Sequence, residues 1–190
     1  MNKITIIIPC YNVEKYLPEC IDSLINQSNQ NFDVIFIEDC STDNTLLVLK
    51  NYLAKNKILF NYLIHENKQN KGLSISRNIG IDLCRTEYIV FLDSDDFYKS
   101  NFIEIILNII STKNIDVLNF GIELFNDGEK PILFDEYKLD LIKIKPNQTL
   151  LEFFINQKIK IQAVSKVFRT EIFHQKNIRF PEKKYYEDVY

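Results

Sequence analysis

The sequence predicts an α/β fold, with three α/β/α layers built around a mostly parallel sheet. Short apolar segments rich in β-branched and aromatic residues alternate along the chain with longer segments whose apolar residues recur at helical spacing. Such alternation indicates βαβ units, in which helices cover both faces of a parallel sheet. With 190 residues and 46% hydrophobic content, the chain is also long and apolar enough to fill one substantial core.

Strands are expected where the apolar runs are short. Isoleucine, valine, phenylalanine and tyrosine dominate these runs, and such residues favour the pleated surface of a sheet. The first run ends at Pro9, and the fourth ends at a cluster of acidic residues. The expected strands are residues 4–8, 32–37, 59–64, 88–92 and 117–125.

Helices are expected between these strands, where apolar residues recur three and four positions apart. In the segment 13–27 these residues are Val13, Leu17, Cys20, Ile21, Leu24 and Ile25. The expected helices are residues 13–27, 42–53, 73–84, 101–110 and 149–155. The regular alternation of strands and helices covers residues 1–115. Residues 116–190 contain a cluster of turn-forming residues at 126–131, and their apolar residues do not recur at a regular spacing. We expect the two halves to form a single structural domain.

Composition and charge exclude several classes of protein. The net charge is -3 and no block of lysine and arginine appears, so nucleic acid is not expected as a partner. The four cysteines form no C-x-x-C pair and the two histidines are far apart in sequence, which argues against a zinc site. Scattered thiols suit a reducing cytoplasm. The apolar run at 4–8 is too short for a secretory signal, and no run reaches the roughly 20 residues of a membrane span.

The acidic cluster after the fourth strand is the most informative local feature. Asp93, Asp95 and Asp96 follow the apolar run 88–92 directly. The carboxyl ends of strands are where open α/β sheets place their ligands. Because clustered carboxylates repel one another, we expect a positive partner, and a divalent metal carrying a phosphorylated substrate fits best. The alternative is that an aspartate here only caps a helix, although one would suffice for that.

Other phosphate-binding and hydrolytic motifs are absent from the sequence. No G-x-G-x-x-G follows the first strand, and neither a Walker A sequence nor a G-x-S-x-G elbow is found. The whole chain contains only four glycines. A phosphate held through a metal is therefore favoured over one held by a glycine-rich loop.

Six segments resemble the motifs of inverting family-2 glycosyltransferases, and they occur in the family's order. The segments are IIIPCYNVE at 6–14, IEDCSTD at 37–43, NKGLSISRNIG at 70–80, FLDSDD at 91–96, SKVFR at 165–169 and YYED at 185–188. Each match is weak alone, but the ordered set is specific. The resemblance implies the GT-A type of fold seen in nucleotide-diphospho-sugar transferases. It also implies a nucleotide-sugar-binding half at 1–115 and an acceptor-side half at 116–190 that is incomplete at its C-terminal end.

The resemblance assigns the following residues to donor binding: Pro9, Tyr11, Glu14, Asp39, Arg77, Asp93 and Ser94. A flat base would lie against Pro9 and Tyr11, and Asp39 would accept a hydrogen bond from a pyrimidine imide N–H. Arg77 offers a planar set of donors for base carbonyls or diphosphate oxygens. Simpler structural roles stay open, namely packing for Tyr11, a surface charge for Arg77 and compensation of a helix dipole for Glu14.

The resemblance also implies a metal and a general base. Asp95 would bind Mn²⁺ or Mg²⁺ directly, while Asp93 would contact a ribose hydroxyl or a metal-bound water. Asp188, beside Glu187, would take the proton of the acceptor hydroxyl.

The implied function is transfer of a hexosyl or N-acetylhexosaminyl group, with inversion, from a nucleotide-diphosphate donor to an acceptor hydroxyl. A UDP-sugar is the favoured donor. The acceptor would be a bacterial surface polysaccharide or a lipid-linked glycan, and the protein would be cytoplasmic, with possible peripheral association at the inner face of the plasma membrane. The alternatives are a non-catalytic nucleotide-sugar-binding fragment and a sugar-nucleotide nucleotidyltransferase.

Two positions depart from the family's usual pattern. Glu38 stands where the family often has aspartate, and Cys40 stands where it often has glycine. If the position of Cys40 requires a positive φ, that residue will be strained.

Overall fold

The structure is a computed structural model that describes residues 2–124, 132–133, 140–142, 162–175 and 177–182. The helix expected at 149–155 and the acidic pair Glu187 and Asp188 lie outside the described residues.

A seven-stranded sheet forms the centre of the molecule, in the order β3-β2-β1-β4-β9-β5-β8. The strands are β1 Ile4–Cys10, β2 Asp33–Glu38, β3 Asn61–Glu66, β4 Tyr88–Phe91, β5 Val117–Asn119, β8 Asp140–Ile142 and β9 Lys166–Arg169. A separate pair is formed by β6 Glu123–Leu124 and β7 Ile132–Leu133. The four strands β1 to β4 are mutually parallel, and β9 enters antiparallel between β4 and β5. Five of the seven strands thus run in one direction, which confirms the predicted mostly parallel sheet.

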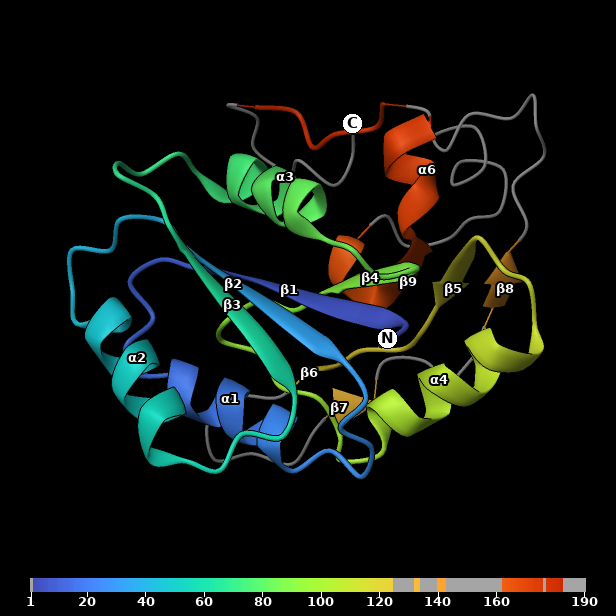
Figure 1. Cartoon of the computed structure of the whole chain (residues 1–190), viewed down its shortest axis with the longest axis horizontal. Coiled ribbons are helices and arrows are strands. Elements are labelled where there is room, and N and C mark those ends of the chain that lie inside the picture. Colours follow the sequence, from blue (N-terminus) through green and yellow to red (C-terminus); the bar gives the residue numbers. More distant parts are fainter. Residues whose placement is uncertain (1, 125–131, 134–139, 143–161, 176, 183–190) are drawn as a thin grey trace.

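Helices cover both faces of the sheet. They are α1 Leu17–Ile25, α2 Thr45–Lys55, α3 Leu73–Leu83, α4 Phe102–Thr112 and α6 Thr170–Gln175, with a 3₁₀ helix at Ala163–Ser165. Figure 1 shows α1, α2 and α4 on one face and α3 and α6 on the other. The three-layer prediction is therefore confirmed.

The alternation of side chains along β1 explains the two apolar cores. Ile4, Ile6 and Ile8 belong to the core beneath α1, α2 and α4, whereas Ile7 belongs to the core beneath α3 and α6. Successive residues of a strand face opposite sides of the sheet, so a strand buried on both faces is mostly apolar. Gly80 allows α3 to approach this strand closely, because a Cβ at Gly80 would lie 2.3 Å from Ile7 Cγ2.

Most predicted elements differ by one to three residues from their observed bounds, and two differ by more. The helix expected at 13–27 begins only at Leu17, because residues 13–16 form a turn in which Tyr16 N donates to Val13 O. Pro18 lies in the first turn of the observed helix, where its missing N–H costs no hydrogen bond. The strand expected at 117–125 is interrupted, because β5 ends at Asn119 and the next strand begins at Glu123.

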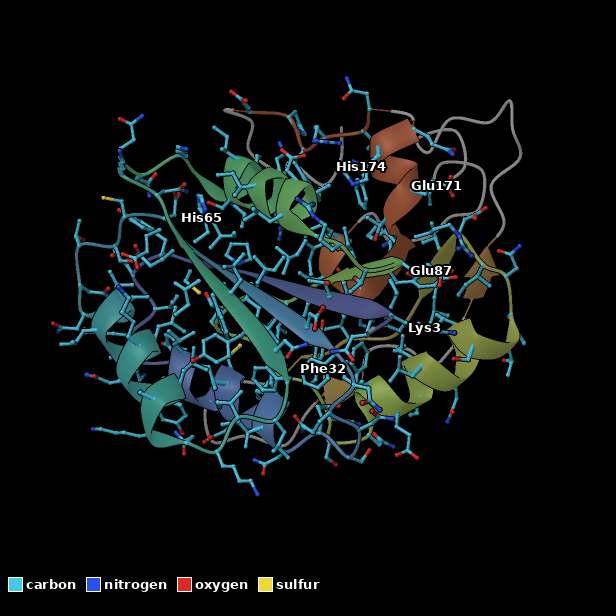
Figure 2. All side chains as sticks on the ribbon, in the orientation of Figure 1. Lys3, Phe32, His65, Glu87, Glu171 and His174 are labelled. Carbon is cyan, nitrogen blue, oxygen red and sulfur yellow. The ribbon has the colours of Figure 1, made fainter. Side chains whose placement is uncertain are left out.

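The two histidines lie on separate parts of the molecule. His65 is on β3 and His174 is on α6, and Figure 2 shows them well apart. Within the described ranges, no helix is both long and apolar enough to cross a membrane.

Candidate functional site

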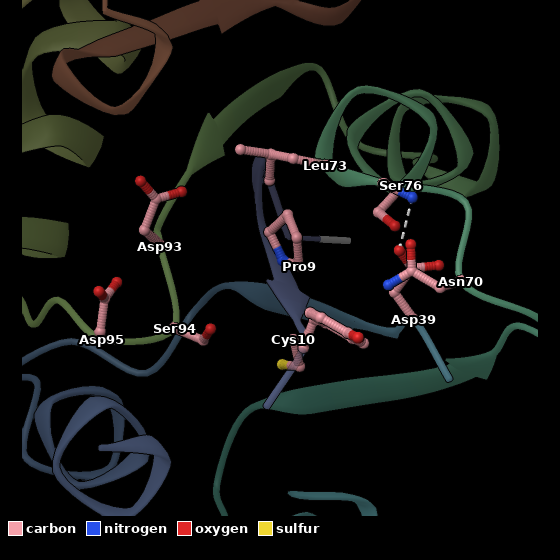
Figure 3. A pocket seen from close by; sticks show the side chains of 11 residues that line it. Pro9, Cys10, Asp39, Asn70, Leu73, Ser76, Asp93, Ser94 and Asp95 are labelled. Atoms are coloured by element: carbon pink, nitrogen blue, oxygen red, sulfur yellow. Dashed lines mark hydrogen bonds between the residues drawn. The ribbon is translucent and has the colours of Figure 1, made fainter. Parts of the chain in front are cut away.

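A cavity of about 370 Å³ opens at the carboxyl ends of β1, β2 and β4. It is lined by Pro9, Cys10, Tyr11, Asp39, Asn70, Gly72, Leu73, Ser76, Asp93, Ser94 and Asp95. Figure 3 shows Asp39, Asn70 and Ser76 towards one end, Asp93 and Asp95 towards the other, and Pro9 and Cys10 between them. This is the edge of an α/β sheet at which ligands are expected.

Asp39 is a buried carboxylate held by the loop before α3. Its Oδ1 accepts hydrogen bonds from Asn67 Nδ2 at 2.7 Å and from Lys71 N at 2.9 Å, and its Oδ2 accepts one from Gly72 N at 2.7 Å. The side chain is only 3% exposed. An ionised carboxylate has about four acceptor positions, so three bonds leave capacity for one donor from a ligand.

The neighbouring Glu38 shapes the turn after β2. Its carboxylate accepts hydrogen bonds from Cys40 N at 3.2 Å and from Ser41 N at 2.7 Å, and it does not line the cavity. Cys40 has a φ of 58°, a left-handed conformation that favours glycine. The position of Cys40 thus does have the positive φ that makes a non-glycine residue strained, and Glu38 accepts hydrogen bonds from the N–H of Cys40 and from the N–H that follows it.

Arg77 lies behind the cavity rather than in its lining. It is 2% exposed, and its Nη2 pairs with Asp93 Oδ1 at 3.0 Å. The guanidinium also lies over the rings of Phe180 and Phe91, with Cζ at 5.3 and 5.9 Å from the ring centroids. Arg77 is therefore not a surface charge, and its position suits orientation of Asp93 more than direct contact with a ligand.

The acidic turn after β4 presents carboxylates at the opposite end of the cavity from Asp39. Asp95 is exposed and lines the cavity, whereas Ser94 beside it is buried. Burial, followed by the charges of Asp93 and Asp95, raises the pKa of Asp96 to about 6. The mutual repulsion expected from the sequence is thus present, and it favours binding of a cation here.

Cys10 and Tyr11 differ in what they present to the cavity. Burial, followed by the charge of Glu38, raises the pKa of the Cys10 thiol, which therefore stays protonated and is a poor nucleophile. Tyr11 is 44% exposed and lines the cavity, so it is not a core residue and its ring is accessible to a ligand.

Glu14 lies outside the cavity lining. Its Oε2 accepts a hydrogen bond from Asn44 N at 2.8 Å, at the start of α2. The structure thus gives Glu14 a helix-terminus role, on α2 rather than on the helix that follows it in sequence. It contributes to a set of bonds between the turns after β1 and β2, in which Val13 N donates to Thr45 Oγ1 at 2.8 Å.

The structure brings together most of the site residues expected from the sequence. Six of them line one cavity: Pro9, Tyr11, Asp39, Asp93, Ser94 and Asp95. Sequence reasoning did not single out the other five lining residues, which are Cys10, Asn70, Gly72, Leu73 and Ser76. The available signal was the Asn-Lys-Gly turn before α3, in which Gly72 adopts a φ of 86°.

The donor groups in the cavity fit a metal that is shared with a phosphorylated ligand. Among the residues described, no group of three or more histidine, cysteine, aspartate or glutamate side chains is arranged to hold a metal by itself. Mg²⁺, however, is usually bound through one or two carboxylates together with substrate phosphates. Asp95, with Asp93 nearby in the lining, offers that kind of donor set.

Glycosyltransferases of other bacteria are similar to this chain in sequence. GlyA, a glycosyltransferase of Streptococcus pneumoniae serotype 4, is 30% identical over 198 residues, which cover 100% of this chain and 27% of GlyA. The poly(ribitol-phosphate) beta-N-acetylglucosaminyltransferase TarS of Staphylococcus aureus is 30% identical over 187 residues, covering 96% of this chain and 30% of TarS.

Solved structures of TarS 1–349 share the fold. The complex with UDP matches with a TM-score of 0.78 and the complex with UDP-GlcNAc with a TM-score of 0.75, both at 27% identity. Both matches cover 98% of this chain, and they cover 53% and 51% of the TarS chains. This chain therefore spans about half of those TarS structures and less than a third of GlyA.

The match to a family agrees with the motifs and with the fold. Residues 5–175 match Glycosyl transferase family 2. This range includes every residue of the cavity lining and all the helices and strands from β2 to α6. The chain therefore belongs to glycosyl transferase family 2.

Proposed function

We propose that this chain binds a nucleoside-diphosphate sugar, most favourably a UDP-sugar, as the donor-binding part of an inverting glycosyltransferase. The observation that carries the proposal is a single cavity at the strand ends with Asp39 at one end and Asp93 and Asp95 at the other. The TarS structures with UDP and UDP-GlcNAc support the same class of ligand, because those chains share the fold at 27% identity.

The Asp39 end suits a pyrimidine base. Its buried carboxylate keeps one acceptor position for the imide N–H of uracil, after its three bonds to Asn67, Lys71 and Gly72. The accessible ring of Tyr11 offers a surface on which a flat base can lie.

The acidic end suits the diphosphate with a bound Mn²⁺ or Mg²⁺, held by Asp95 with the support of Asp93. Such a metal, when bound, supplies charge stabilisation to the departing nucleoside diphosphate. Arg77 contributes indirectly, because its pairing with Asp93 at 3.0 Å fixes the direction of that carboxylate.

The general base is proposed from the sequence alone. Asp188, with Glu187 beside it, would accept the proton of the acceptor hydroxyl as that hydroxyl attacks the anomeric carbon from the face opposite the leaving group. One displacement of this kind inverts the anomeric configuration and needs no covalent enzyme intermediate. This agrees with a cavity whose thiol, Cys10, is held in its protonated form.

The proposed acceptor is a growing bacterial surface polysaccharide or a lipid-linked glycan. TarS is named for transfer to poly(ribitol-phosphate), which supports an envelope glycan as the acceptor class.

We further propose a cytoplasmic protein that associates peripherally with the inner face of the plasma membrane. Cosedimentation with anionic lipid vesicles tests that association, and recovery of all the protein in the supernatant would contradict it.

Calorimetric titration of the chain with UDP, in Mn²⁺ and then in EDTA, tests the donor assignment. We expect binding that requires Mn²⁺ and that is lost in Asp95→Ala, because Asp95 is the accessible carboxylate of the lining. Asp82→Ala is the matched control, since Asp82 is an exposed aspartate on α3 that does not line the cavity. Binding that is indifferent to EDTA would remove the metal from the proposal, and absence of nucleotide binding would remove the function.

A further inference from the structure

Ser76 is a polar residue of the cavity that the roles above do not explain. It lies on α3, is fully buried and lines the cavity. Its Oγ has no hydrogen-bond partner, and among the described lining residues it is the only buried side-chain oxygen in that condition. Burial removes the hydrogen bonds that a hydroxyl makes to water, so an unpaired buried hydroxyl is rare and calls for an explanation.

Gly72 connects Ser76 to Asp39. The N–H of Gly72 donates to Asp39 Oδ2 at 2.7 Å, and the carbonyl of Gly72 accepts from Ser76 N at 3.1 Å. Ser76 therefore lies one helical turn after the residue that holds the Asp39 carboxylate. Figure 3 shows both side chains towards the same end of the cavity, away from Asp93 and Asp95.

The two groups have complementary hydrogen-bonding properties. An ionised carboxylate only accepts, whereas a hydroxyl can donate as well as accept. A carboxylate and a hydroxyl at one end of a pocket match a ligand edge on which an N–H lies beside a carbonyl. Uracil has such an edge, whereas cytosine has an unprotonated ring nitrogen beside an amino group.

We propose that Ser76 is a specificity-determining residue, whose hydroxyl donates to a base carbonyl while Asp39 accepts from the adjacent ring N–H. The inference rests on the proposed function and deepens it. It gives a part in the recognition of uracil to Ser76, for which the family resemblance implied no role. The competing explanation is that Ser76 is simply a small residue that lets α3 pack on the sheet. Alanine satisfies that packing equally well, so the two explanations differ in a measurable way.

The test is calorimetric titration of Ser76→Ala with UDP and with CDP, both in Mn²⁺, together with thermal unfolding. We expect UDP affinity to fall roughly 3- to 10-fold, as for loss of one neutral hydrogen bond, and CDP affinity to change much less. The Tm should be unchanged or raised, because the substitution removes a hydroxyl that has no partner in the folded protein. Ser74→Ala is the matched control, since Ser74 is buried on the same helix and does not line the cavity.

Each outcome decides between the explanations. Wild-type UDP affinity in Ser76→Ala would make Ser76 a packing residue and overturn the inference, while the proposed function would stand. Equal losses of affinity for UDP and CDP would overturn the inference that Ser76 distinguishes uracil from cytosine. If titration of the wild-type chain with UDP gives no more heat than titration of buffer with UDP, the proposed function fails and the inference fails with it.

Discussion

Replacement of Asp39 by asparagine is the sharpest test of base recognition, because asparagine keeps the size of the side chain and removes its charge. The carboxylate accepts from Asn67 Nδ2 and Lys71 N on Oδ1, and from Gly72 N on Oδ2. The single amide oxygen of asparagine can keep the pair of bonds on the Oδ1 side. Its NH₂ group would then face the N–H of Gly72, so one buried donor loses its acceptor.

The structure sets the size of the expected effects. One buried donor left without a partner costs about 1–3 kcal/mol of unfolding free energy. Alanine would leave all three donors unpaired and would approach the total stability of about 5–15 kcal/mol of a typical domain, which makes Asp39→Ala ambiguous. A hydrogen bond from the uracil N–H to a charged acceptor is worth about 1.5–3 kcal/mol, so UDP affinity should fall roughly 10- to 100-fold in Asp39→Asn.

Glu38→Gln provides the matched control for this test. Glu38 is also a buried carboxylate that accepts from two backbone N–H groups of a loop, but it does not line the cavity. Urea denaturation should show stability losses of the same order in the two variants. Calorimetry should show a large loss of UDP affinity only in Asp39→Asn. Equal losses of affinity in both would mean that Asp39 acts through the loop and does not contact the base.

Three further predictions concern stability and catalysis. The pKa of Asp96 is raised to about 6, so ionisation of this carboxyl destabilises the folded state as the pH rises from 3.8 to above 6. Asp96→Asn should therefore increase the unfolding free energy at pH 7.5 and not at pH 4. Equal gains at both pH values would refute this. Gly80→Ala should destabilise by about 1–3 kcal/mol in urea denaturation through its clash with Ile7, and a double-mutant cycle with Ile7→Ala should be non-additive. Asp188→Asn should reduce sugar transfer by ~10²–10⁴-fold without reducing UDP affinity, whereas the same result in Glu187→Gln alone would move the base to Glu187.

The positions of the central strands and of their acidic ends could be predicted because they depend on local pattern. The run 88–92 is buried on both faces, so it is apolar throughout, and the change to aspartate marks its end at the sheet edge. The edge strand β3 was displaced by two residues from its predicted range of 59–64. Its Tyr62 and Leu63 are about half exposed, and apolar residues on an edge strand look the same in sequence as those on a central one.

Contacts between distant segments could not be predicted in the same way. The place of β9 between β4 and β5 depends on pairing between distant segments, such as Ile89 with Phe168, which are 79 residues apart. The bond from Val13 N to Thr45 Oγ1 ties the turn before α1 to the first residue of α2, 32 positions away, and the local pattern does not contain such a contact. The helical spacing of apolar residues was correct, but spacing alone does not show at which residue the helix begins.

The burial of Arg77 also depends on a contact between distant segments, and it changes where a cation is expected to bind. Phe180 covers the guanidinium from a segment about 100 residues away, which reciprocal hydrogen bonds with Asn78 hold at 2.9 Å. Once Arg77 is enclosed, its charge compensates Asp93, so attraction of a cation depends mainly on the two aspartates that follow. Burial is the main cause of the raised pKa of Asp96, and the charges of Asp93 and Asp95 raise it further, so repulsion still contributes there. Of Asp95 and Asp96, only Asp95 lines the cavity, which is the reason for proposing Asp95 as the metal ligand and an orienting role for the ion pair of Arg77 and Asp93.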